Sequence, residues 1–337
     1  MNIRQKIENE VFVKGYKDMD FSAQMIIREA LKRKIKVEVL DRKNNFIRLI
    51  KGKKIEYLYD ANYTSLDSQI CTFLMENKFV SKIVLSEHGL KVADGGIYYS
   101  EESALRDFEK KYKKLDLIVK PNTTNFGIGI NFVSKGNKAE FINAIKYSFK
   151  FDSSILVEEF IKGEEYRFLV LGGKLEAIVF RRPANVTGDG IHTIKELIKI
   201  KNDDLSNYKK ITRDEILASE VEKNYLKTQG LSFSSIPKKG QIIFVRKNSN
   251  VATGGDAIDV TDDLHFGYKK IAEKAAKSVG AKICGVDIMI QDIKAKPTPK
   301  NYCIIELNPN PGLTIHRFVW GGKVRPVEKK TLDLLGF

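Results

Sequence analysis

The stretch "YCIIELNPNPG" (302–312) begins as an apolar strand and ends in a turn rich in proline. Ile304 and Ile305 suit the interior of a β-sheet. Glu306 and Asn308 follow at once, before the prolines and a glycine end the strand. Because side chains alternate along a strand, Glu306 and Asn308 point to the same face. A strand that is otherwise apolar therefore aims a carboxylate and an amide in one direction.

The preceding apolar run, "KICGVDIMI" (282–290), is joined to this strand by "QDIKAKPTPKN". If the two runs pair as an antiparallel hairpin, we expect Asp287 to lie opposite Glu306, because the two positions are symmetric about a point between residues 296 and 297, close to the middle of the connection. Opposed side chains have Cβ atoms about 4.5–5.5 Å apart, where like charges destabilise. With the amide of Asn308, the two carboxylates suit Mg²⁺ held jointly by protein and phosphate oxygens. The alternative is that Asp287 pairs with a lysine and Asn308 only caps a turn.

A second pattern, "IVKPNTTNFGIGI" (118–130), delivers Lys120 from a strand into a loop with Gly127 and Gly129. Backbone N–H groups of such a loop can approach phosphate oxygens, and the lysine adds a positive charge. The loop is not a Walker A loop, which requires Gly-Lys-Ser/Thr after the glycines. An ordinary glycine turn explains this pattern equally well.

A third pattern, "ILVEEFIKGEEYRF" (155–168), places apolar residues around Glu158 and Glu159, and Gly163 breaks the strand before Glu165. A nucleobase can slide between the apolar groups and bond backbone atoms. A carboxylate such as Glu165 can accept hydrogen bonds from ribose hydroxyls. An acidic edge strand is the alternative. Taken together, the three patterns predict a site for a nucleoside triphosphate.

Length and composition set the class of protein. The chain has 337 residues, of which 42% are hydrophobic and 30% charged, which suits two or three packed subdomains. No run of about 18 apolar residues predicts a membrane span, and the N-terminus lacks an apolar signal-peptide segment. Three cysteines without metal-like spacing predict reduced thiols in a cytoplasmic protein.

The formal net charge is +15 at neutral pH. A polyanion such as nucleic acid is one explanation of this charge. The lysines are nevertheless spread through every segment and are not interleaved with aromatic residues. We therefore expect a solvated surface, with some lysines facing a smaller anion, and neither a nucleic acid nor a membrane as a partner.

Periodicity predicts alternating helices and strands along the whole chain. The main predictions are a helix and strand over 22–41, a hairpin over 45–59, two helices over 65–90, a strand over 116–121, a helix over 138–149, a hairpin over 165–182 turning at Gly172-Gly173, a helical insertion over 200–240 and a helix over 265–280. The change of pattern along the chain predicts three domains: an N-terminal α/β lead-in (1–75), a small subdomain with the phosphate loop (76–163) and a C-terminal subdomain with the metal site (164–337).

The order of these motifs resembles the ATP-grasp superfamily. Segments such as "MENKFVSKIVLSEHGLKV" (75–92), "KPNTTNFGIGI" and "AKICGVDIMI" resemble the ATP-grasp half of the bifunctional glutamate–cysteine ligase/glutathione synthetases. The segments "PANVTGDGIHTI" (183–194) and "TGGDAIDVTDD" (253–263) also resemble cyanophycin synthetases. The resemblance implies an α/β (α+β) ATP-grasp fold, in which two subdomains hold ATP between antiparallel sheets behind the lead-in domain.

The resemblance also implies roles for individual residues. It would place Lys78 and Lys120 on the ATP phosphates, with Asn125, Gly127 and Gly129 in the phosphate loop; Glu158, Glu159, Phe160 and Ile161 around adenine; Glu165 on the ribose; Asp287, Glu306 and Asn308 on magnesium; and Arg181 and Arg246 near the substrate carboxylate and acyl phosphate.

The activity that the resemblance implies is ATP-dependent amide-bond formation between γ-glutamylcysteine and glycine, with two Mg²⁺ ions for which Mn²⁺ can substitute. A separate glutamate–cysteine ligase would act upstream, the enzyme would be cytoplasmic, and a homodimer is compatible with the pattern. The tail 308–326 differs from the fused enzymes and leaves the amine open. Another amino-acid or peptide ligase of the cyanophycin-synthetase kind is the alternative. A non-catalytic nucleotide-binding module is a weaker one, because binding alone needs no paired metal carboxylates.

Overall fold

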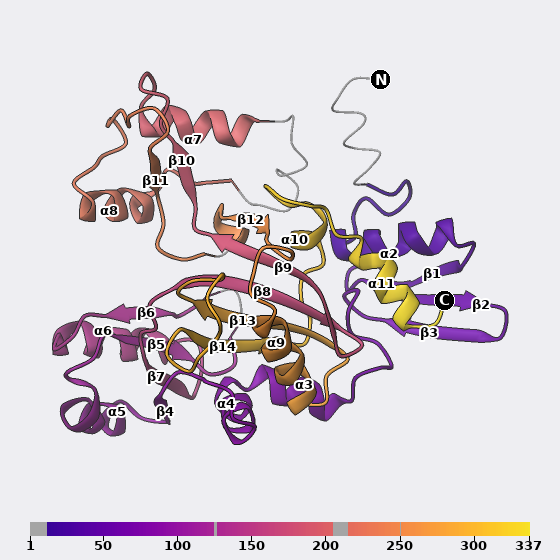
Figure 1. The fold of residues 1–337 in the computed structure, drawn as a ribbon, viewed down its shortest axis with the longest axis horizontal. Helices are drawn as coiled ribbons and strands as arrows, with labels where there is room; N and C mark the ends of the chain where they lie inside the picture. Colours follow the sequence, from indigo (N-terminus) through magenta and orange to yellow (C-terminus); the bar gives the residue numbers. More distant parts are fainter. Residues whose placement is uncertain (1–11, 125–126, 205–214, 250) are drawn as a thin grey trace. The chain divides into compact units, whose positions relative to one another are not determined.

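The chain is represented by a computed structural model that describes residues 12–124, 127–204, 215–249 and 251–337 (Figure 1). It divides into two compact units, each assembled from segments that are far apart in the sequence. Unit 1 comprises Met1–Leu66, Glu165–Asp262 and Asn310–Phe337, and unit 2 comprises Asp67–Glu164 and Asp263–Pro309. None of the helices within the described ranges is long and apolar enough to cross a membrane.

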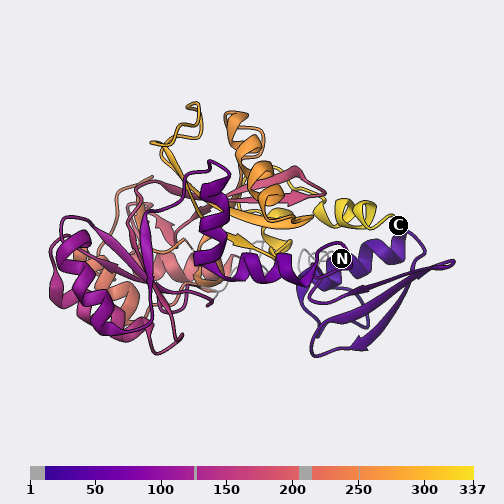
Figure 2. The same ribbon diagram turned by 90° about the horizontal axis from the view of Figure 1, so that it is seen from below.

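The lead-in part of unit 1 is a helix on a small sheet. Helix α2 (Phe21–Lys32) begins after Asp20, whose carboxylate accepts a hydrogen bond from the Ser22 backbone N–H at 2.7 Å. The antiparallel sheet that follows contains β1 (Lys36–Asp41), β2 (Phe46–Lys51) and β3 (Lys54–Leu58). Figure 2 shows the C-terminal helix α11 (Val327–Leu334) beside α2. Arg33 joins the two helices through an ion pair to Asp333 at 2.7 Å.

A long hairpin forms the centre of unit 1. Strands β8 (Glu164–Leu171) and β9 (Lys174–Arg182) are antiparallel, and β9 also pairs with β12 (Asp256–Asp259). Residues along β8 such as Phe168 and Leu169 are fully buried. The short helices η3 (Val251–Thr253) and α10 (Thr314–Arg317) accompany this sheet.

A satellite of unit 1 has its own small core. It contains β10 (Asn185–Thr187), α7 (Ile194–Asp203), α8 (Glu220–Thr228) and β11 (Ile242–Phe244), which lie together in Figure 1. Buried residues from all four elements, among them Ile198 and Leu226, pack into one apolar cluster. The predicted helical insertion over 200–240 is only partly right, because residues 229–241 form turns that lead into β11.

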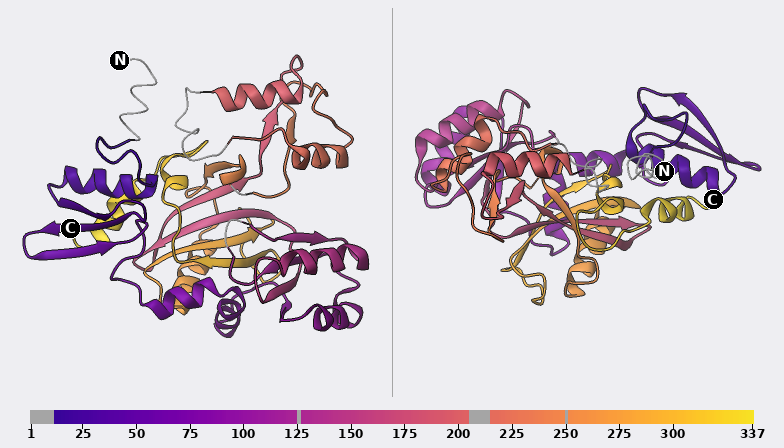
Figure 3. Two further views of the ribbon diagram at one scale, coloured as in Figure 1. Left: turned by 180° about the vertical axis from the view of Figure 1, so that it is seen from behind. Right: turned by 90° about the horizontal axis from the view of Figure 1, so that it is seen from above.

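Unit 2 contains a four-stranded antiparallel sheet covered by helices on one face. The strand order is β4 (Gly95–Tyr98), β7 (Ile155–Glu159), β5 (Leu117–Pro121) and β6 (Asn131–Val133). Helix α5 (Glu101–Asp107), the π-helical turn η1 (Phe108–Tyr112) and α6 (Lys138–Ser148) supply the other half of its core (Figure 3). Phe108 stacks on Phe141 there, with ring centroids 4.5 Å apart. The side chains of Lys120 and Glu158 alternate onto the other face of this sheet.

The rest of unit 2 is built around a second hairpin. Strands β13 (Ile283–Ile290) and β14 (Tyr302–Asn308) are antiparallel, and helices α3 (Gln69–Glu76), α4 (Lys78–Glu87) and α9 (Gly267–Ser278) accompany them. The Asp67 carboxylate accepts hydrogen bonds from the backbone N–H groups of Lys282 and Ile283, at 2.6 and 3.0 Å. Asp67 therefore fixes the point at which β13 begins.

The α/β class is confirmed, as are the hairpins over 45–59 and 165–182 and the two helices between 65 and 90. Strands of three or four residues, such as β6 and β12, were not predicted, because they are too short to show an alternating pattern. The three domain ranges stay a prediction.

The turn between β8 and β9 gives a test of backbone strain. Gly173 has φ +79°, and a Cβ added there would meet nothing within 4 Å. Replacing Gly173 by Ala should lower the free energy of unfolding by about 1 kcal/mol, because only the left-handed conformation is disfavoured. Gly173→Asn should lower the free energy of unfolding by a smaller amount, since asparagine adopts the left-handed conformation more readily than alanine. Urea denaturation measures both, and an alanine variant as stable as the wild type would contradict this account.

Candidate active site

Asp287 and Glu306 are directly opposite each other in the β13–β14 pair, as the sequence predicts. The register shifts beside Asp287: Ile288 faces Ile304, so that Ile305 is the extra residue of a β-bulge. Without this extra residue, Asp287 would face Ile305. The bulge therefore brings the second carboxylate into place.

One face of β14 belongs to the hydrophobic core, and the other belongs to the candidate site. Leu307 is 3% exposed and belongs to the core, whereas Glu306 and Asn308 are half-buried on the opposite face. Asn308 faces Gly285, which has no side chain to fill the space beside the amide. The Asn308 amide nitrogen is buried and has no hydrogen-bond partner within the described ranges. This amide is therefore available to a ligand.

Helix α4 brings the first lysine to the acidic pair. The Lys78 ammonium lies 3.9 Å from a carboxylate oxygen of Glu306 and donates a hydrogen bond to the Thr124 carbonyl. The start of α4 is held in turn by Asn122, whose side-chain oxygen accepts from the Phe79 backbone N–H at 3.0 Å. Lys78 thus connects a candidate metal ligand to the beginning of the glycine loop.

A buried ion-pair network lies next to this group. The Lys120 ammonium is 3.0 Å from Oε2 of Glu158, and the Lys82 ammonium donates to Oε1 of the same carboxylate. All three side chains are less than 9% exposed. Lys82 follows Lys78 by one helical turn, so both lysines extend from the same side of α4.

Burial and the acids act on the lysines in opposite directions. Burial lowers the pKa of Lys82 to about 8, although Glu158 opposes this effect. Burial also lowers the pKa of Lys78, against the attraction of Glu306. For Lys120, burial alone would lower the pKa, but Glu158 and Glu306 outweigh it and the pKa is raised. The charge of Glu306 therefore acts on both candidate phosphate lysines.

The glycine loop is anchored at both ends. The Gly129 carbonyl accepts hydrogen bonds from the Ser148 hydroxyl and the Asn131 amide at 2.8 and 2.9 Å. A Cβ on Gly129 would come within 2.6 Å of Pro121, and φ is +77°, so only glycine fits. At the other end, Asp152 accepts from the backbone N–H of Thr123 at 2.7 Å.

Two further loop residues complete the predicted set. Gly127 has φ +76° and open space where a Cβ would be, which leaves its backbone accessible. Asn125, which the sequence places in the same loop, lies outside the described residues.

The residues predicted around adenine follow β7. The Glu159 carboxylate lies 3.4 Å from the Lys91 ammonium and accepts from the Asp94 backbone N–H at the same distance. The Phe160 backbone N–H donates to the Asp116 carbonyl at 2.8 Å, and its ring meets that of Phe132 edge to face at 5.1 Å. Ile161 continues this segment and is half-buried.

Three predicted residues belong to unit 1. Arg181 forms an ion pair with Glu165 at 2.6 Å, and the Ser249 hydroxyl donates to the same carboxylate. Arg246 donates to the fully buried Glu222. Each arginine is thus oriented by an acid of its own unit.

The residues of unit 2 fit a hard divalent cation. Two opposed carboxylates and the side-chain oxygen of Asn308 form an oxygen-rich donor set of the kind that Mg²⁺ prefers. Across the described ranges, no group of three or more histidine, cysteine, aspartate or glutamate side chains could hold a metal ion. Asp287, Glu306 and Asn308 would therefore hold the cation together with oxygens from a ligand or water.

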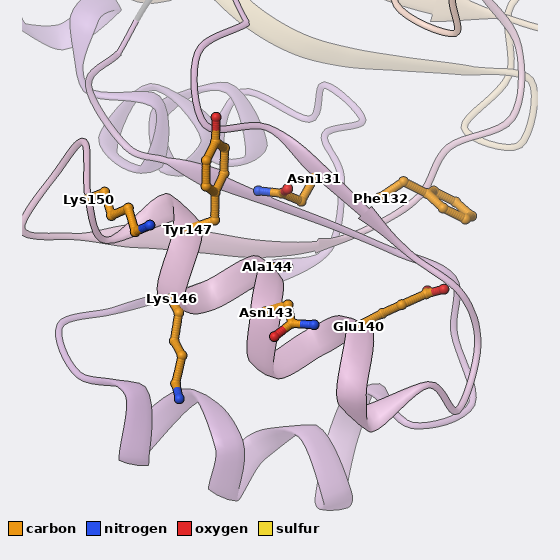
Figure 4. Close-up of a pocket in the computed structure, with 8 residues that line it drawn as sticks. All are labelled: Asn131, Phe132, Glu140, Asn143, Ala144, Lys146, Tyr147 and Lys150. Atoms are coloured by element: carbon orange, nitrogen blue, oxygen red, sulfur yellow. The ribbon is translucent and has the colours of Figure 1, made fainter. Parts of the chain in front are cut away.

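Unit 2 also has an open cavity of about 490 Å³ between β6 and α6 (Figure 4). Its lining includes Asn131, Asn143, Tyr147 and Lys150. Figure 4 shows these side chains on β6, on α6 and just after it, pointing in different directions. None of the predicted nucleotide or metal residues that the structure describes lines the cavity.

Sequence reasoning missed Lys82, Asp152 and Ser148. Lys82 had a signal, because it stands four residues after Lys78 and one turn of a helix brings such residues to one side. The sequence contains no comparable signal for Asp152 and Ser148. Their partners Thr123 and Gly129 belong to another segment, and only the folded sheet brings each pair together.

Three family models match successive parts of the chain. An ATP-grasp-like domain matches residues 17–70, the D-ala D-ala ligase C-terminus matches 84–189, and a RimK-like ATP-grasp domain matches 237–321. Together they extend from the lead-in to the strand that carries Glu306.

Curated relatives match nearly the whole chain. The glutathione biosynthesis bifunctional protein GshAB of Clostridium perfringens is 46% identical over 324 residues, which are 95% of this chain and 42% of that protein. The protein of the same name from Listeria innocua is 42% identical over 326 residues, again 42% of its length. The chain thus spans less than half the length of these relatives.

A solved structure supports the same relationship as the curated relatives. The crystal structure of a bifunctional glutathione synthetase from Pasteurella multocida matches with a TM-score of 0.76 and 36% identity, and it covers 98% of this chain and 46% of that one. The chain belongs to the ATP-grasp superfamily, and nearly all of it is similar to one part of the bifunctional glutathione biosynthesis proteins.

Proposed function

We propose that the chain binds ATP together with Mg²⁺ and uses it to join a carboxylate to an amine. The observation that carries this proposal is the opposition of Asp287 and Glu306 beside the ammonium of Lys78. Two hard carboxylates next to a cationic side chain suit a metal ion that shares its coordination with phosphate oxygens. Without a bound cation, two opposed carboxylates would only weaken the strand pair.

The nucleotide would extend from β7 to β14. Lys78 and Lys120 would contact its phosphates, and the influence of Glu306 on the pKa of both lysines supports a shared location. Residues 159–161 would border adenine, and Glu165 would bond the ribose. The loop around Gly127 would offer backbone N–H groups to the phosphates.

The reaction has two steps. An oxygen of the donor carboxylate attacks the γ-phosphorus of ATP, and the bond to the bridging oxygen breaks to release ADP and leave an acyl phosphate. The amine nitrogen then attacks the acyl carbon, phosphate leaves, and the nitrogen loses a proton to give the amide. Bound Mg²⁺ would neutralise charge on the phosphate oxygens.

Arginine side chains would hold the anionic partners during these steps. Arg181 and Arg246 each use part of the guanidinium on an acid, Glu165 or Glu222, which limits how the rest can point. A guanidinium fixed in this way can form paired hydrogen bonds with a carboxylate or phosphate.

We propose γ-glutamylcysteine as the carboxylate donor and glycine as the amine, so that the product is glutathione. The names of the relatives, which all describe glutathione biosynthesis, support this choice. The donor would have to come from a glutamate–cysteine ligase. The cytoplasmic location and the homodimer stay predictions.

A panel of substrates tests this proposal. ADP release should be fastest with γ-glutamylcysteine plus glycine, and mass spectrometry should detect glutathione. Aspartate, arginine and alanine as donors, each with several amines, are the comparison. If one of these donors gave faster ADP release, the glutathione assignment would fail while the ligase assignment stood.

The metal role of Glu306 has its own test. Glu306→Gln keeps the shape of the side chain and removes its charge, so turnover should fall by about 10² or more while the fold survives. Steady-state ADP release across a Mg²⁺ titration measures the effect, and Glu87→Gln, an exposed acid at the end of α4, is the control. Normal turnover of the Glu306 variant at millimolar Mg²⁺ would remove Glu306 from the metal site.

A further inference from the structure

Three elements of unit 2 meet in the buried network of Lys82, Glu158 and Lys120. Along β5 and β7, Lys120 is opposite Leu156, so Glu158 is its diagonal neighbour on the same face of the sheet. Diagonal neighbours are within reach of long side chains. Lys82 approaches the same carboxylate from α4. The network therefore joins the helix that carries Lys78 to the strand that carries Lys120.

The contacts of Glu158 differ from the role that family resemblance implies for it. A residue that recognises adenine needs a polar atom free to meet the base. Oε1 of Glu158 accepts from Lys82, Oε2 lies 3.0 Å from Lys120, and the residue is 4% exposed. Each carboxylate oxygen thus has a lysine as a partner, and little of the side chain is exposed to a base.

The arrangement instead fixes the direction of one ammonium group. A carboxylate with a single partner can rotate, or it can direct both of its oxygens at that partner. Because Lys82 holds Oε1, only Oε2 is directed at Lys120. A lysine side chain has four rotatable bonds, and a fixed partner of this kind restricts where its charge lies.

We propose that Lys82 and Glu158 are positioning residues that hold the Lys120 ammonium for phosphate binding. This inference rests on the proposed function, because it takes Lys120 to be a phosphate ligand. The competing explanation is that Lys82 only balances the charge of a buried carboxylate.

The first test compares the effect of Glu158 on binding of the phosphates with its effect on binding of the base. Glu158→Gln should weaken ADP binding at least tenfold, about 1.4 kcal/mol, while adenosine binding stays within twofold of the wild type. Calorimetry measures ADP, and ligand-observed NMR titration measures adenosine. Glu109→Gln is the matched control, because Glu109 also joins two lysines, Lys113 and Lys138, but at the surface of unit 2.

An equal loss for adenosine and ADP would show that Glu158 acts on the base, and an unchanged ADP affinity would show that it positions nothing. Either result overturns the inference. If the wild type itself failed to bind ADP, the proposed function would fail first, so the two failures are distinguishable.

The second test removes the charge imbalance. Lys82→Met or Glu158→Gln alone leaves a buried charge short of a partner and should lower the melting temperature. The double variant Lys82→Met/Glu158→Gln should recover stability, yet ADP should still bind at least tenfold more weakly than to the wild type, because Lys120 has lost its fixed partner. Recovery of both stability and ADP affinity would mean that the pair only balances charge and would contradict the proposal.

Discussion

The opposition of Asp287 and Glu306 across one strand pair is the constraint on which the rest of the candidate site depends. Two carboxylates in directly opposed positions repel each other and weaken the sheet locally. The bulge at Ile305 creates this opposition, where a regular ladder would have placed an isoleucine against Asp287. Such an arrangement is stable only if positive charge is close by, from the protein or from a ligand.

Helix α4 supplies part of that charge from the protein. Lys78 reaches Glu306, and one turn further Lys82 reaches Glu158, so a single helix face serves both acids. Lys120 completes a group in which three lysines accompany the carboxylates of Glu158, Asp287 and Glu306. Equal numbers of positive and negative side chains let the group stay folded without a ligand.

Local patterns predicted much of this arrangement. The pattern of polar and apolar residues predicts both hairpins, and approximate symmetry about the connection predicts that Asp287 faces Glu306. Exact symmetry would pair Asp287 with Ile305, and the bulge at Ile305 moves the register by the one residue that brings Glu306 opposite Asp287. Contacts between segments that are far apart in the chain could not be predicted from the sequence. Lys82 and Glu158 are 76 residues apart, and only the packing of α4 against the sheet brings them together. The contacts of Glu158 with Lys82 and Lys120 are visible only in the folded structure.

The most direct test of the account is the coupling between metal and nucleotide. If the opposed carboxylates and the lysines hold Mg²⁺ and phosphate as one group, each ligand must raise the affinity of the other by the same factor. Calorimetric titration of Mg²⁺, with and without a saturating non-hydrolysable ATP analogue, measures that factor after correction for metal bound by the free analogue. The account predicts a coupling of at least about tenfold, or 1.4 kcal/mol. Equal Mg²⁺ affinity in the two titrations would contradict it.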